Sequence, residues 1–64
     1  MKVDLYFKND LAGQHRFKNL MSYVFIHQEC FNDISFTFWD SGITVHLEYN
    51  VLTKQEFYKQ FIEK

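Results

Sequence analysis

Residues 34–49 alternate apolar and polar side chains on both sides of a short polar break. Alternation with a period of two is typical of half-buried β-strands, because successive side chains of a strand point to opposite faces of the sheet. Two such runs around a glycine predict a β-hairpin. This hairpin limits the chain to folds that place one apolar sheet face against other elements.

The two strands of this hairpin have a defined register, because their apolar side chains must lie on the same face. A turn at Ser41 and Gly42 satisfies this requirement, and we expect Gly42 to supply the positive φ angle that such turns demand. A longer loop that also contains Asp40 would need a bulge to keep the faces matched. The expected pairs are Phe38 with Val45, Phe36 with Leu47, and Ile34 with Tyr49.

The N-terminal part of the chain predicts a strand followed by a helix. Val3, Leu5 and Phe7 alternate with polar residues, which indicates a strand. From about Gln14 the period becomes that of an amphipathic helix that ends near residues 32–33. A strand over residues 22–27 is the alternative, because this segment is rich in β-favouring residues. The helical stripe consists of Phe17, Leu20, Met21, Val24 and Phe25.

The C-terminal segment predicts a second helix. Thr53 and Glu56 have the spacing of a capping box, in which each side chain bonds the backbone N–H group of the other residue. Leu52 and Phe57 have the spacing of the matching hydrophobic staple. We expect this helix to run from Lys54 to nearly the end of the chain.

The expected fold is a single small α+β domain over residues 1–64, with elements in the order β-α-β-β-α. We interpret it as a three-stranded sheet with two helices packed on one face. The order of the strands in the sheet stays open. The expected core consists of Val3, Leu5, Phe7, Ile34, Phe36, Phe38, Val45 and Leu47 from the sheet, and Phe17, Leu20, Val24, Phe57 and Phe61 from the helices.

The overall composition excludes several classes of protein. Seven basic and eight acidic residues give a net charge of −1, which is unlike a strongly basic nucleic-acid binder. Cys30 is the only cysteine, and neither a signal segment nor an apolar run of ~20 residues is present, so we expect a cytoplasmic protein. The absence of proline and the single alanine suggest an AT-rich coding sequence, as in a phage or mobile element.

Catalytic and metal-binding signatures are weak. The histidines are scattered, and the potential ligands within residues 27–30 do not converge on a helix as zinc ligands do. His46 and Glu48 share a strand face and suggest an acid-base pair with Asp40 nearby, but exposed polar decoration is the favoured interpretation. We therefore expect no enzyme, metal, cofactor or small-molecule substrate.

The sheet face turned away from the helices is the first predicted binding surface. Tyr6 and Trp39 offer aromatic area of the kind that dominates protein interfaces. Packing of Trp39 across Thr44 without any partner is one alternative, and stacking against nucleic-acid bases is another. The predicted residues of this surface are Tyr6, Thr37, Trp39, Thr44 and His46.

A stripe on the first helix is the second predicted binding surface. Tyr23, Ile26 and Cys30 are spaced i, i+3 and i+7, on the side away from the apolar core stripe. Exposed apolar patches on small proteins usually mark contacts, so this stripe predicts a partner or dimer interface. The alternative is that the helix is covered on both sides.

These surfaces lead to a functional hypothesis. We expect a non-enzymatic protein-binding module, either a homodimer or an inhibitor-like or adaptor-like protein, that acts through exposed aromatic surface. The alternative is a small nucleic-acid-binding regulator encoded by a phage or mobile element. Electrostatics disfavour this alternative, because the few basic residues stand among acidic ones.

Overall fold

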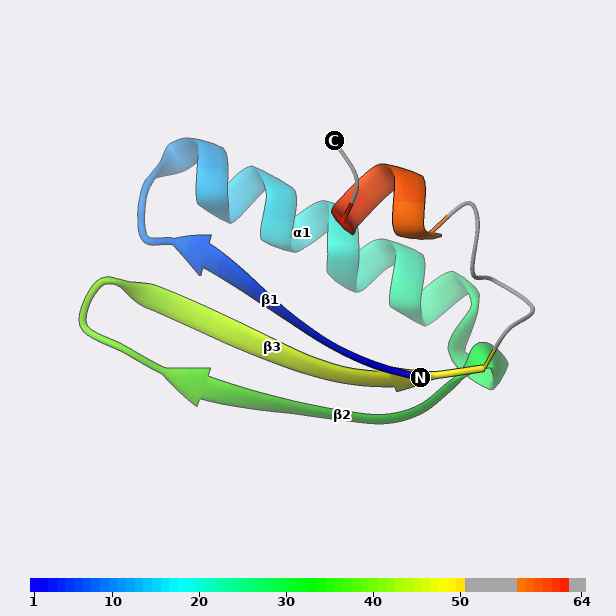
Figure 1. The fold of residues 1–64 in the computed structure, drawn as a ribbon. Helices are drawn as coiled ribbons and strands as arrows, with labels where there is room; N and C mark the ends of the chain where they lie inside the picture. The colour runs from blue at the N-terminus through cyan, green and yellow to red at the C-terminus, as the bar shows by residue number, and fades with distance from the viewer. Residues whose placement is uncertain (51–56, 63–64) are drawn as a thin grey trace.

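Three strands and the helical segments that cover them form the described part of the chain. In a computed structural model, the structure describes residues 1–50 and 57–62. The α+β class and the order of the main elements agree with the sequence-based expectation (Figure 1). The elements are β1 (Lys2–Lys8), α1 (Leu11–Ile26), the short 3₁₀ turn η1 (Gln28–Cys30), β2 (Phe31–Phe38), β3 (Gly42–Tyr49) and the π-helical segment η3 (Tyr58–Ile62).

The sheet has the strand order β1-β3-β2, which the sequence left open. Both neighbouring pairs are antiparallel, with Leu5 opposite Val45 on one side of β3 and Phe36 opposite Val45 on the other. The C-terminal hairpin strand is therefore central, and β2 lies at an edge. Figure 1 shows β2 at the lower edge of the sheet, with β3 between it and β1.

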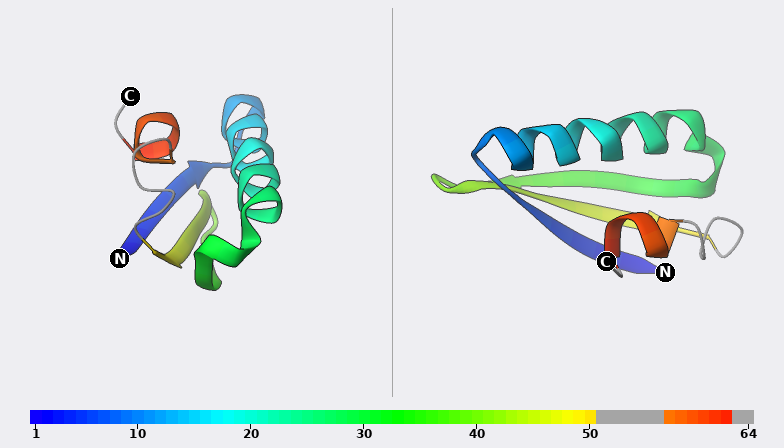
Figure 2. Two further views of the ribbon diagram at one scale, coloured as in Figure 1. Left: turned by 90° about the vertical axis from the view of Figure 1, so that its right-hand side faces the viewer. Right: turned by 90° about the horizontal axis from the view of Figure 1, so that it is seen from above.

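Both helices pack on one face of the sheet, as expected (Figure 2). The ring of Tyr23 on α1 lies 5.8 Å from that of Phe57, at the start of the C-terminal helical turn. Phe57 and Leu20 are completely buried, as is Val45 in the centre of the sheet. The buried cluster consists of Phe7, Leu20, Tyr23, Val45, Leu47, Tyr49 and Phe57.

The hairpin register differs from the expected one by two residues. The turn consists of Asp40 and Ser41, and it is closed by a hydrogen bond of 2.8 Å from the Trp39 N–H group to the Gly42 carbonyl oxygen. Gly42 belongs to β3 and does not have a positive φ angle. A shift of two residues keeps every side chain on its face, so alternation alone does not distinguish the two registers. The observed pairs are Phe38 with Ile43, Phe36 with Val45, and Ile34 with Leu47.

Gly42 is needed for a close approach between strands rather than for a turn angle. A β-carbon at this position would collide with the carbonyl oxygen of Phe7 on β1. Gly13, in the first turn of α1, is in the same situation, since its β-carbon would collide with the carbonyl oxygen of Lys8. Both glycines therefore fix the junctions between β1 and its neighbours.

Helix α1 begins earlier than the periodicity indicated. Asp10 is its N-cap, and the carboxylate accepts a hydrogen bond of 2.7 Å from the Gly13 N–H group. Residues 22–26 are helical, so the alternative strand over residues 22–27 is wrong. The expected helix end near residues 32–33 is wrong as well, because α1 ends at Ile26 and these residues already belong to β2. The predicted capping box of the second helix and its partner Leu52 lie outside the described residues.

The expected core is wrong on β2. Ile34, Phe36 and Phe38 lie on the helix-covered face, as the alternation indicated, but all three are exposed. The buried side chains of this face belong to the other two strands, such as Phe7 on β1 and Leu47 on β3. At the edge, α1 covers the apolar face of β2 only in part, through the contact of Phe17 with Phe36.

Candidate functional site

Exposed apolar side chains gather along β2. Ile34, Phe36 and Phe38, here called the edge strip, are exposed to 37%, 40% and 79%. The Phe36 ring stacks on the Phe38 ring, with a centroid distance of 6.4 Å, and also lies 6.4 Å from the ring of Phe17 on α1. The edge strip therefore continues the apolar core out to the margin of the sheet.

The backbone of the same three residues faces the open edge. Trp39 and Gly42 form a hydrogen-bonded pair, with N–H···O distances of 2.8 and 3.4 Å. Hydrogen-bonded pairs alternate with non-bonded ones along an antiparallel ladder, so the next residues of β2 that bond β3 are Thr37 and Ser35. The residues between them are those of the edge strip, and they direct their N–H and C=O groups away from β3. In residues 1–50 and 57–62, no strand pairs with this side of β2.

This edge has little protection against pairing. Natural edge strands are usually shielded by bulges, lysines or prolines. Here the register irregularity lies at the start of the strand, between Phe31 and Asp33, and the Asp33 carboxylate caps the Ile34 N–H group at 3.0 Å. Beyond Ile34 the strand continues to Phe38 without a bulge, a charged residue or a proline.

A shallow groove adjoins the end of the edge strip. It has a volume of about 230 Å³ and lies between the first turns of α1 and the hairpin. Typical small-molecule sites have roughly 300 to 1,000 Å³. Its apolar lining, which includes Phe17, Phe38 and Ile43, makes it an extension of the edge strip.

The predicted open-face residues do lie together, and hydrogen bonds connect them. The Trp39 indole N–H donates to the Thr44 hydroxyl at 2.8 Å, and the Tyr6 hydroxyl donates to Ser41 Oγ at 2.6 Å. Tyr6 and Trp39 are exposed to 46% and 56%. Thr44 and Ser41 thus hold both aromatic side chains in place on this face.

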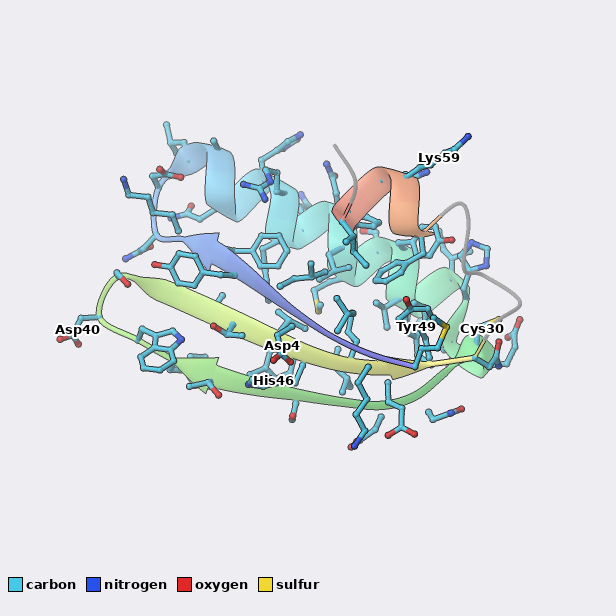
Figure 3. All side chains as sticks on the ribbon, in the orientation of Figure 1. Asp4, Cys30, Asp40, His46, Tyr49 and Lys59 are labelled. Carbon is cyan, nitrogen blue, oxygen red and sulfur yellow. The ribbon has the colours of Figure 1, made fainter. Side chains whose placement is uncertain are left out.

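His46 connects the three strands on the open face. Its Nε2 atom lies 2.7 Å from Thr37 Oγ1, and its Nδ1 atom lies 2.8 Å from Asp4 Oδ1 (Figure 3). Since a carboxylate only accepts, Nδ1 carries the donated proton, and in the neutral ring Nε2 accepts from the threonine hydroxyl. The suggested acid-base partners, Glu48 and Asp40, are therefore not the residues that hold this imidazole.

The order of hydroxyl, imidazole and carboxylate is that of a serine-hydrolase triad. Here, however, Thr37, His46 and Asp4 line neither the groove beside Phe38 nor the smaller one beside Arg16. The imidazole and carboxylate side chains are exposed to 37% and 70%. The two hydrogen bonds of His46 connect β1, β2 and β3 across the open face.

The predicted helix stripe does not form a surface. Tyr23 and Cys30 are buried, and only Ile26 is exposed, to 68%. The expectation that this stripe faces solvent is wrong for two of its three members. Tyr23 lies on the face of α1 that packs against the C-terminal turn, and Cys30 belongs to η1, beyond the end of α1 at Ile26. The ring of Tyr23 contacts those of His27, Phe31, Phe57 and Phe61.

The described residues contain no group of three or more His, Cys, Asp and Glu side chains that could hold a metal ion. Within the same residues, no helix is both long and apolar enough to cross a membrane. Comparison of the chain with protein-family models, curated proteins and solved structures gave no match.

Proposed function

We propose that this protein is a non-enzymatic protein-binding module that binds an extended partner segment along the free edge of β2. One observation supports this proposal above the others: the edge strip combines exposed apolar side chains with backbone groups that no described strand pairs. In binding by strand addition, backbone hydrogen bonds provide affinity and alternate side chains provide specificity.

The edge strip suits this mode of binding in two ways. Phe36 and Phe38 lie next to each other, with ring centroids 6.4 Å apart, so a single partner segment can cover both rings. Aromatic side chains are also the residues that most often dominate interface energies. A partner strand with apolar residues at alternate positions would bury the edge strip and satisfy its N–H and C=O groups.

The open face supports a binding role less well. The polar groups of Trp39 and Tyr6 already have partners in Thr44 and Ser41. Binding of nucleic acid at this face is disfavoured as well, because the carboxylate of Asp4 lies beside His46 and would repel phosphates. The exposed rings of this face remain a secondary contact area.

A peptide-display selection tests the proposal without knowledge of the natural partner. Immobilised protein is exposed to a library of random linear peptides, and the selected peptides are then tested against variants. We expect peptides with alternating apolar residues, whose binding falls at least about tenfold in F38K. The matched control is F25K, which changes an equally exposed phenylalanine, 73% exposed, on α1.

The control variants also separate the two surfaces. Y6S changes the open face and should leave binding of the selected peptides unchanged. Peptides that bind wild-type and F38K protein equally well, or a selection that enriches nothing, would contradict the proposal. Circular dichroism of each variant shows whether the fold is retained.

A further inference from the structure

We infer that the edge of β2 binds a second copy of this chain, so that two sheets join in an antiparallel β2-β2 pair centred on Phe36. This inference rests on the proposed function and names its partner. It makes a six-stranded sheet from two three-stranded ones, with a twofold axis that passes between the two Phe36 residues.

The spacing of the edge strip is self-complementary. Backbone groups directed to the open edge occur at positions 34, 36 and 38, and an antiparallel pair centred on Phe36 aligns these positions with each other. In this pair the Ile34 N–H group would exchange its bond to the Asp33 carboxylate for one to the Phe38 carbonyl oxygen of the second copy. In this register Phe36 stands opposite Phe36 of the second copy, and Ile34 stands opposite Phe38. A shift by two residues in either direction leaves one apolar residue of each strip without an apolar partner.

Charge is compatible with the same register. Asp33 is the only charged residue of β2, and the register places it opposite Trp39 of the second copy rather than opposite another carboxylate. On the open face, Ser35 of one copy stands opposite Thr37 of the other, and both side chains are small and uncharged. Like charges directly opposite each other would have weakened the pair.

The exposed area indicates a weak, reversible dimer. From their exposed fractions, the edge strip and Trp39 offer roughly 300 to 500 Å² per chain, taking about 150 to 250 Å² for a whole large side chain. The total lies below the roughly 1,200 Å² at which stable specific interfaces begin. We therefore expect association at micromolar rather than nanomolar concentration.

Sedimentation velocity measures this association. The wild-type protein is examined from about 1 to about 500 µM, a range that brackets a micromolar dissociation constant. We expect a monomer-dimer equilibrium that F38K weakens at least about tenfold and F25K leaves unchanged. Wild-type protein that stays monomeric throughout, or a dimer that F38K does not weaken, would overturn the inference.

Disulfide formation tests the register independently of any loss of apolar area. In a C30A background, F36C should link to itself, because residues opposite each other in a hydrogen-bonded pair have Cα atoms about 5.5 Å apart. F38C alone should not link, since the two copies of residue 38 would lie four residues, about 14 Å, apart along the strands. The double variant I34C/F38C should link.

These outcomes separate the inference from the proposed function. Failure of F36C to link, or linkage of F38C at the same rate, overturns the proposed β2-β2 pair. If such a protein still binds displayed peptides in a manner that F38K abolishes, the proposed function stands without the dimer. If it binds no peptide either, both are overturned.

Discussion

Phe36 and Phe38 stack on each other at the free edge of the sheet, with ring centroids 6.4 Å apart and ring planes inclined by 30°. Phe38 is largely exposed, and the ring of Phe17 contacts only the inner member of the pair. The two rings therefore form an apolar surface beside backbone groups that no described strand pairs. That combination is the basis for assigning this edge to binding.

Replacement of Gly42 by alanine tests the close approach of β3 to β1. G42A should lower the free energy of unfolding by about 2 kcal/mol, because the added methyl group would collide with the carbonyl oxygen of Phe7. D40A, in the same turn but exposed, should change it by less than about 0.5 kcal/mol. Urea denaturation of both variants provides the comparison, and equal stability of the two would contradict the assignment.

Removal of the α1 N-cap should cost about 1 kcal/mol. The Asp10 carboxylate satisfies the Gly13 N–H group, which has no partner within the helix. D10A loses this hydrogen bond, whereas D10S keeps an acceptor at the same position. Thermal unfolding should place D10S close to the wild type. A D10S protein as unstable as D10A would show that the cap is not the cause.

Tyr23 and Ile26 should respond very differently to truncation. Tyr23 is buried among aromatic rings, so Y23A should destabilise the protein by about 3 kcal/mol. Ile26 is exposed, and I26A should change stability by less than about 0.5 kcal/mol. Comparable effects in chemical denaturation would mean that α1 is rotated relative to its place in the structure.

The hydrogen bonds of His46 predict its tautomer. In the neutral ring the proton should reside on Nδ1, where it is donated to Asp4, while Nε2 accepts from Thr37. Nitrogen-15 NMR at alkaline pH distinguishes the two tautomers. D4A should remove the preference for Nδ1, and D33A, which deletes a carboxylate elsewhere, should keep it. An Nε2-protonated ring in the wild type would contradict the network.

The sequence specifies the elements and the faces of the strands, because these depend on local periodicity. The face of α1 is only partly specified, since Phe25 of the apolar stripe is exposed whereas Tyr23 is buried. The alternation around Phe36 and Val45 correctly assigns both residues to one face, and the Phe17 stripe correctly predicts a helix. The register differs by two residues because a shift of two preserves every face. The observed register places Gly42 against Phe7 on β1, 35 positions away in the chain, where a β-carbon would not fit.

The candidate site was harder to predict from the sequence. Alternation shows that β2 has an apolar face, but whether Phe38 is covered depends on the strand order, which is a property of the whole sheet. The helix stripe is wrong for a related reason, since the burial of Tyr23 depends on Phe57 far along the chain, and Cys30 lies beyond the end of α1 at Ile26. The open-face residues, in contrast, follow from alternation alone and were found.

Amide hydrogen exchange of Phe36 tests the central claim most directly. The amide of Phe36 points to the open edge, whereas that of its neighbour Thr37 bonds β3 and serves as an internal control. Exchange is measured by NMR at about 50 µM and about 1 mM, on either side of the expected weak association. We predict that exchange at Phe36 slows markedly at the higher concentration while exchange at Thr37 does not change. A Phe36 amide that exchanges like an unprotected one at both concentrations would contradict binding of a second copy at this edge.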